Sequence, residues 1–165
     1  MIPAPLAYLW AAPASLIGLA LAATLVAGRG QVYRHSGVLE VAGGPTGWLL
    51  ARGLPFSGPV AAITLGHVVL AVSVAALDAT RRHERVHVAQ FERWGPLFLL
   101  AYPLASLHAW LRGGHPYLDN VFEIEARAEC QEPVGLWNRR LQIDRSGPFF
   151  TGFSHPQGVR RIRKR

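Results

Sequence analysis

The feature that most constrains this chain is the stretch His83-Glu84-Arg85-Val86-His87, in which two histidines stand four residues apart. On an α-helix a four-residue step turns about 400° and rises about 6 Å, so both imidazoles leave one face and can converge on one ion. Glu84 leaves the helix beside them, where its carboxylate can take a proton from a metal-activated water without being a ligand. The stretch predicts a helix carrying half of a metal site, with His83 and His87 as ligands and Glu84 as the catalytic residue.

The pattern H-E-x-x-H is the two-histidine zinc-binding pattern of many metallopeptidases, but it is short and needs support from its context. Arg85 departs from the usual pattern, because the two spacer positions in such helices are mostly uncharged. The alternative is a solvated helical turn with Arg81, Arg82, Glu84 and Arg85 on its wet side.

Composition points to a chain that contacts lipid. The 165 residues suit one domain, half of them are hydrophobic and only 16% are charged, and the mean hydropathy is +0.20. Cys130 is the single cysteine, which excludes an intrachain disulfide and suits a reducing compartment.

The formal charge of +7 does not predict a nucleic-acid partner. Much of the positive excess lies in residues 160–165, and no aromatic side chain is interleaved there to stack on bases. A basic end beside hydrophobic segments more simply contacts anionic lipid head groups.

The N-terminal stretch predicts a membrane anchor over residues 1–28. No charged residue occurs from Pro5 to Gly28, and Leu6–Ala27 is long enough to cross the hydrocarbon as a helix. A cleaved signal peptide fits less well, because a positive segment before the apolar run is missing and the run is longer than usual. Arg29 and Arg34 follow, which favours a cytoplasmic location for the remainder.

Residues 31–72 predict strands and turns that form a small antiparallel sheet. Residues 31–34 and 38–41 have the lengths of a hairpin, residues 48–51 follow as another extended run, and residues 53–59 form a turn-rich link.

Residues 60–72 are rich in β-branched side chains, so we expect a strand with a bulge or bend at Gly66; a second membrane helix continuing to Leu77 is the alternative. We interpret His67 as a hydrogen-bonded core residue. The strand that ends near Leu70 is the expected edge for an extended peptide to pair with.

The motif helix is expected to begin after Ser73 or Asp78 and to end at Trp94, before Gly-Pro. Gln90 falls seven residues after His83 on the same face, where it either lines the site or is polar surface.

The apolar run from Pro96 to Leu111 follows the motif helix. As a helix it would be about 24 Å long, short of the ~30 Å hydrocarbon core. If it crossed, later residues would be separated from His83 and His87 by the membrane. A shared metal site therefore requires this run to pack back against the motif helix or to dip into the bilayer and return.

A third ligand is expected from a helix over residues 121–130, capped by Asp119 or Asn120. Two histidines leave a catalytic zinc one protein ligand short, and a carboxylate from a second helix is a common completion. Glu123 and Glu125 are the candidates, and only one can face the metal because they lie about 200° apart on a helix.

The combination of H-E-x-x-H with a later Phe122-Glu123-Ile124-Glu125-Ala126 resembles the gluzincin zinc metallopeptidases, particularly membrane-associated ones. The resemblance implies that Glu123 is the third zinc ligand and Glu125 its solvent-side neighbour. Arg127 stands where the family pattern has Asp, which leaves the expected partner of a histidine ligand unassigned. The chain also resembles small uncharacterised bacterial membrane-associated proteins reading His-Glu-x-x-His-Val-x-Gln and later Asn-x-Phe-Glu-x-Glu-Ala, over roughly residues 60–130.

Together these patterns predict an α+β fold: an N-terminal transmembrane helix, a small antiparallel sheet, and a helical zincin-like core. We expect an anchor (1–28), a metallopeptidase domain (29–145) and a basic, flexible tail (146–165). The expected function is a membrane-associated zinc metallopeptidase that uses Zn²⁺ and takes a peptide or protein substrate, with membrane lipid as a further partner.

Two alternatives remain: a catalytically silent zincin-like scaffold or binding protein, and a small membrane protein without a metal. Sequence does not indicate the oligomeric state.

Overall fold

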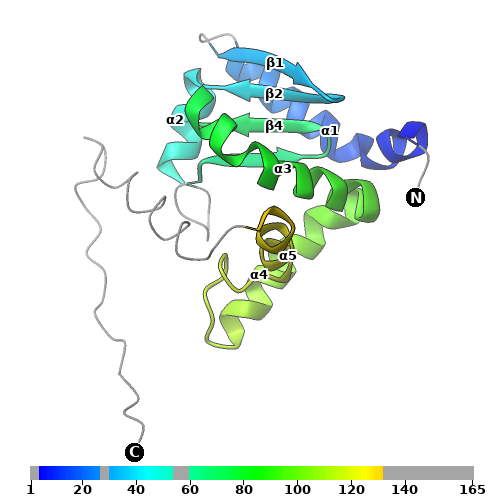
Figure 1. Cartoon of the computed structure of the whole chain (residues 1–165), viewed down its shortest axis with the longest axis vertical. Helices are drawn as coiled ribbons and strands as arrows, with labels where there is room; N and C mark the ends of the chain where they lie inside the picture. The colour runs from blue at the N-terminus through cyan, green and yellow to red at the C-terminus, as the bar shows by residue number, and fades with distance from the viewer. Residues whose placement is uncertain (1–3, 27–29, 54–59, 132–165) are drawn as a thin grey trace, which may run out of the picture. The chain divides into compact units, whose positions relative to one another are not determined.

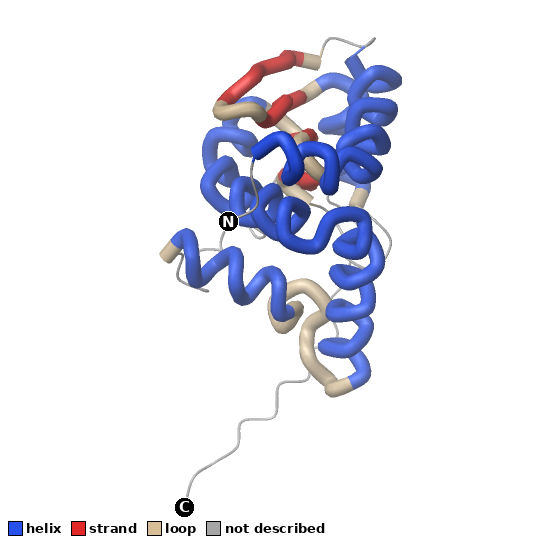
Figure 2. The backbone as a smooth tube through the Cα atoms, turned by 90° about the vertical axis from the view of Figure 1, so that its right-hand side faces the viewer, coloured by secondary structure: helices blue, strands red, loops and turns tan. Residues whose placement is uncertain are grey.

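The computed structural model describes residues 4–26, 30–53 and 60–131. It is an α+β structure in which a four-stranded sheet is covered by helices on both faces, and a pair of further helices follows (Figure 1). In Figures 1 and 2 the sheet lies at one end of the described part, with α4 and α5 at the other. The elements in chain order are α1 (Ala4–Val26), β1 (Gln31–His35), β2 (Val38–Ala42), α2 (Gly44–Arg52), β3 (Ala62–Leu65), β4 (Val68–Ala71), α3 (Val74–Trp94), the 3₁₀ turn η1 (Gly95–Leu97), α4 (Phe98–Leu111) and α5 (Val121–Cys130).

Both predicted extended regions contain a hairpin. The β1–β2 turn has Ser36 and Gly37 at positive φ (46° and 80°), which suits the right-handed twist of the paired strands. The run 60–72 folds as β3 and β4 around Gly66, also at positive φ (62°), so the expected bend is a tight turn. The alternative of a membrane helix through residues 60–77 is wrong.

The sheet is mixed, so the prediction of an antiparallel sheet is wrong for one strand pair. The strand order is β1-β2-β4-β3, with β2 and β4 parallel and the two hairpin pairs antiparallel. The parallel pair exists because β4, the second strand of its hairpin, inserts beside β2.

Residues 48–51, predicted as extended, belong instead to helix α2. Gly43 and Gly44 at positive φ turn the chain, Pro45 occupies the first turn, and Gly53 ends the helix. The apolar run Trp48-Leu49-Leu50 suits a strand or a helix equally, and Leu50 is buried against the sheet.

Alternate strand residues pack on opposite faces of the sheet. Val38, Ala42, Val69 and Ala71 pack with Leu77 and Val88 of α3. Val41, Val68 and Leu70 pack with Ala22 of α1 and Leu50 of α2. Burial on both faces explains why β4 is hydrophobic at every position.

Helix α1 confirms the predicted N-terminal apolar helix. By length and composition it could cross a membrane, although signal sequences and buried core helices share this length and composition. Its small residues Ala7, Ala11, Ala14 and Ala22 are buried, and Gly18 meets Leu65 and Val68 so closely that a Cβ would lie 2.7 Å from the Val68 Cβ. The helix therefore packs along its length on the remainder of the fold.

Helix α3 begins and ends where the sequence predicts. Ser73 caps it by accepting a hydrogen bond from the Ala76 N–H, and it stops at Trp94 before Gly95. Arg81 ties it to β2 through two hydrogen bonds, of 3.2 and 3.1 Å, with the buried carboxylate of Glu40.

Helix α4 packs back against both α3 and α5, as a shared metal site requires. Asn120 caps α5 by accepting from the Phe122 N–H, while its own amide donates to Tyr102 O (3.1 Å) and Ser106 Oγ (2.8 Å) of α4. One buried side chain thus starts α5 and locks it to α4. Apart from Gly53, the expected link at 53–59 lies outside the described residues, as does the expected tail at 146–165.

Candidate metal centre

Three predicted ligands meet at one point. His83 and His87 of α3 and Glu123 of α5 are all buried, and their ligand atoms lie within 4.8 Å of one another. His83 Nε2 is 3.1 Å from His87 Nε2 and 3.1 Å from Glu123 Oε2, and His87 Nε2 is 3.2 Å from Glu123 Oε1. Ligands held tetrahedrally at zinc bond lengths of about 2.0–2.1 Å lie about 3.3 Å apart. This group could hold a metal ion of that size.

Gln90 fixes which nitrogen of His87 faces the cluster. The Gln90 amide nitrogen donates to Phe122 O (3.1 Å) and to Glu125 Oε2 (2.8 Å), so its oxygen must point to His87 Nδ1 at 2.8 Å. Nδ1 therefore carries the proton, and the lone pair of Nε2 in the neutral ring points into the cluster, as metal binding requires. Gln90 is fully buried, so it lines the site and is not polar surface.

The carboxylate of Glu123 is held from several sides. Tyr102 donates to Oε1 at 2.7 Å, and Arg127 Nη1 lies 3.9 Å from Oε2. Burial opposes its ionisation, but the hydrogen bonds and charges of His83 and His87 lower the pKa of Glu123 well below its usual value. Glu123 is therefore an anion, which is the form that binds a metal.

The site favours positive charge. Burial lowers the pKa of His87, but the hydrogen bond and charge of Glu123 and the charge of Glu84 outweigh it and raise that pKa to about 9. Burial and the nearby Glu123 charge raise the pKa of the Tyr102 and Tyr117 phenols, so both stay neutral donors. A divalent cation would relieve the same excess of negative charge.

Glu84 lies on the same helix and is held by a residue of the sheet. Its side chain is 5% exposed, and its Oε2 accepts a hydrogen bond of 2.7 Å from Thr64 Oγ1 of β3. β3 is an edge strand, whereas β4, which the sequence suggested as the edge, lies between β2 and β3. The edge prediction is therefore wrong by one strand.

Glu125 lies beside the cluster without joining it. It pairs with Arg93 at 2.8 Å and accepts from Gln90, and the Arg93 hydrogen bond, ahead of an opposing burial effect, lowers the pKa of Glu125. Among the described residues, the group that could hold a metal ion therefore contains Glu123 and not Glu125, in line with the family resemblance.

The arginines that weakened the motif have structural partners. Arg85 donates to the backbone oxygens of His35 and Ser36 in the β1–β2 turn, and its guanidinium lies 3.6 Å from Glu40. With His83, Glu84 and His87 buried, the alternative of a solvated helical turn is wrong. Arg127 donates to Leu118 O and faces Glu123. The partner of a histidine, which the sequence leaves unassigned, is Gln90, which contacts His87.

Sequence reasoning missed three residues around the centre: Thr64, Tyr102 and Tyr117. It predicted Asn120 as a cap but missed its hydrogen bonds to α4. No spacing rule links these residues to the motif, because each reaches it from another element. The Asn120-x-Phe122-Glu123 pattern is the one available signal, and it points to Asn120 only through the resemblance.

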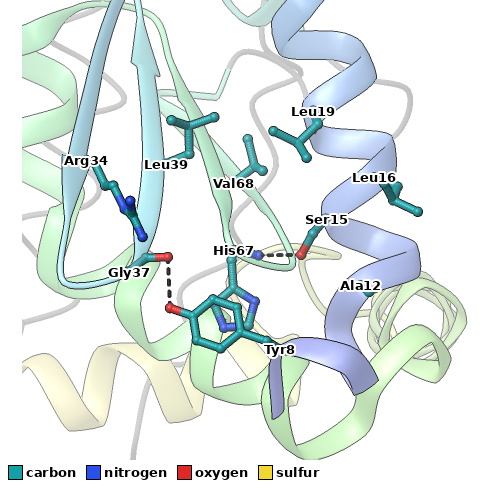
Figure 3. Close-up of a pocket in the computed structure, with 10 residues that line it drawn as sticks. All are labelled: Tyr8, Ala12, Ser15, Leu16, Leu19, Arg34, Gly37, Leu39, His67 and Val68. Carbon is teal, nitrogen blue, oxygen red and sulfur yellow. Dashed lines mark hydrogen bonds between the residues drawn. The ribbon is translucent and has the colours of Figure 1, made fainter. Parts of the chain in front are cut away.

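A separate cleft of about 460 Å³ lies between α1 and the two hairpin turns (Figure 3). Tyr8 donates to Gly37 O, and the His67 backbone N–H donates to Ser15 Oγ. The His67 ring stacks on Tyr8 and its Nε2 lies 3.0 Å from Glu92 Oε1, so His67 docks α1 and takes no part in the metal cluster.

Comparison with protein-family models found no match, and neither did comparison with curated proteins or with solved structures. What is known of the site therefore comes from its own geometry: a buried His-His-Glu group, with a second buried glutamate beside it, that could hold a metal ion.

Proposed function

We propose that this chain is a membrane-associated zinc metallopeptidase with a zincin-like core formed by α3, α4 and α5. The observation that carries the proposal is the convergence of His83, His87 and Glu123 within 4.8 Å. Two imidazoles and one carboxylate are a typical zinc set, and three protein ligands leave the fourth position open, as in catalytic rather than structural sites.

Glu84 is the proposed general base. Thr64 occupies one of its carboxylate oxygens at 2.7 Å, which leaves the other to accept a proton from the attacking water and to return it to the leaving amine. When bound by these three ligands, zinc supplies Lewis acidity to the scissile carbonyl and to the water. The burial of Glu84 keeps bulk water away from the proton transfer.

We propose that an extended peptide adds to the edge of β3 that pairs with no described strand. The strand carries Thr64, which contacts Glu84, so a peptide paired there would run beside the metal centre. Backbone pairing gives affinity without demanding a particular sequence.

Replacing Glu84 with Gln tests the assignment. We expect the zinc content of purified Glu84→Gln protein to equal that of the wild type, because Glu84 is not a ligand, while chelator-sensitive hydrolysis of an unstructured peptide falls by at least about 10²-fold. His87→Ala is the matched control and should lose zinc as well as hydrolysis. Full activity in Glu84→Gln would refute the role.

The scaffold alternative gives a different result in the same experiment. Stoichiometric zinc in the wild type with no cleavage of any peptide would assign the centre to structure or binding. A wild type without zinc would remove both interpretations.

The proposed location is the membrane, with α1 as the attachment. α1 is apolar enough to enter a membrane and exposes large residues such as Leu9 and Leu16. If it crosses, Arg29 and Arg34 favour a cytoplasmic metal centre.

A further inference from the structure

Helix α4 has a second apolar face that no described residue covers. Leucines recur every three or four residues from the end of η1 along α4: Leu97, Leu100, Leu104, Leu107 and Leu111. Leu97 is 56% exposed, Leu100 65%, Leu104 62% and Leu111 69%. Trp110 extends this outer stripe and is 60% exposed. Soluble proteins rarely leave so large a continuous apolar surface bare.

The opposite face of α4 is packed into the metal centre. Phe98 and Ala109 are buried, and Tyr102 bonds Glu123. On a helix these residues point about 200° away from the outer stripe, so the exposure of the leucines is not an effect of loose packing. α4 therefore has one apolar face toward the protein and another toward its surroundings.

The composition of α4 selects lipid over a second copy of the chain. The leucine spacing also suits a coiled coil, but the helix covers only about two heptads, contains Pro103, and has no charged residue from Gly95 to Leu111 to pair across a helical interface. Trp110 lies at the end of the stripe and Arg112 follows it, which suits a segment at a bilayer surface.

The start of the stripe lies close to the candidate membrane helix α1. Gly95, which precedes Leu97, lies so close to Trp10 of α1 that a Cβ there would be 2.3 Å from the indole. α1 and the start of α4 are thus neighbours, and α1 likewise exposes large residues such as Leu9 and Leu16.

We propose that the outer stripe of α4 inserts into the lipid surface and holds the metal centre at the membrane interface. Because one helix of about 10 Å diameter separates the stripe from Glu123, a peptide bond at the centre would lie within about 10 Å of the lipid. Resting on the proposed peptidase function, this makes the substrate class polypeptide segments that lie at or emerge from the membrane surface.

Spin labels on the full chain test the lipid contact without requiring activity. In a Cys130→Ala background, cysteines replacing Leu104 on the stripe and Glu129 on the exposed side of α5 are labelled, and the protein is reconstituted in vesicles of equal parts phosphatidylcholine and phosphatidylglycerol. We expect the ratio of oxygen to nickel-chelate accessibility to be severalfold higher at position 104 than at 129. Equal ratios would overturn the proposal, and spin–spin broadening at position 104 would overturn it in favour of a second copy.

A second variant tests the consequence for substrates. Leu104→Glu combined with Leu107→Glu should retain zinc, reduce cleavage of a peptide tethered to vesicles severalfold, and leave cleavage of the same free peptide unchanged. Val32→Glu on the exposed strand β1 is the control and should change neither. Equal loss on both peptides would count against the interfacial role, whereas a wild type that cleaves neither peptide would refute the peptidase and leave the spin-label result to decide the lipid contact.

Discussion

Gln90 connects the two halves of the candidate metal centre through a single amide. It orients the His87 ring on α3 and contacts Phe122 O and Glu125 on α5, the helix that supplies Glu123. Partners that orient a metal-binding histidine usually matter for affinity nearly as much as the ligands.

Replacing Gln90 with Leu should weaken zinc binding about 10- to 100-fold, because the His87 ring loses its oriented partner while the ligands remain. Competition with a chromophoric chelator measures the affinity. Arg93→Gln is the control, since Arg93 contacts the same Glu125 but no ligand, and its affinity should match the wild type. An unchanged affinity in Gln90→Leu would show that Gln90 is only packing.

Thr64 is predicted to position Glu84. Thr64→Val removes the hydroxyl at nearly constant volume, so kcat should fall about 10- to 100-fold while KM, zinc content and Tm stay near wild type. Thr64→Ser keeps the hydroxyl and should recover most of the rate. Equal rates in the Val and Ser variants would contradict this role.

The sequence predicts the site residues that a local pattern connects. His83, Glu84 and His87 follow from helical spacing, and Glu123 follows from the Phe-Glu-x-x-Ala resemblance. Thr64 and Tyr102 lie 20 and 21 residues from their partners and act through tertiary contacts, so no local period reveals them.

At the scale of elements, α3 joins the sheet to the metal centre. Its first half is tied to β2 by Arg81 and Glu40, and its middle carries the candidate ligands His83 and His87. The Glu40 hydrogen bond, partly offset by burial, raises the pKa of Arg81, so the guanidinium stays charged.

Glu40→Ala should lower the free energy of unfolding by about 1–2 kcal/mol, because Arg81 loses its hydrogen bonds to the buried carboxylate while its partly exposed guanidinium stays in contact with water. Asp78→Ala removes the exposed partner of the same arginine and should cost less than about 0.5 kcal/mol. Urea denaturation followed by tryptophan fluorescence compares the two. Similar losses in both variants would argue against the Arg81–Glu40 pair as a main contact between α3 and β2.

The elements themselves were easier to predict than their pairing. Ser73, Trp94 and the turn at Gly66 mark boundaries by local chemistry, whereas the parallel pairing of β2 with β4 depends on a long connection through α2 and β3. The prediction of a strand at residues 48–51 is wrong because the packing of Leu50 on the sheet, and not the strand propensity of these residues, decides their conformation.

At the scale of the whole molecule, zinc would join helices that are far apart in the chain. Binding to the folded state alone stabilises it by about 4 kcal/mol when free zinc is 1,000-fold above Kd. A chelator should therefore lower Tm of the wild type and of Glu84→Gln by several degrees, and should leave His87→Ala unchanged. A chelator-induced shift that persists in His87→Ala would place the metal elsewhere.

Helix α1 closes one face of the sheet with its alanines and Gly18, which gives it a second duty besides any attachment to lipid. A shortened protein that starts at Gly30, made to gain solubility, would lay bare Val41, Val68 and Leu70. Such a deletion would remove the exposed apolar side of α1 but expose the apolar face of the sheet, so recombinant work on this chain should keep its first helix and supply a detergent instead.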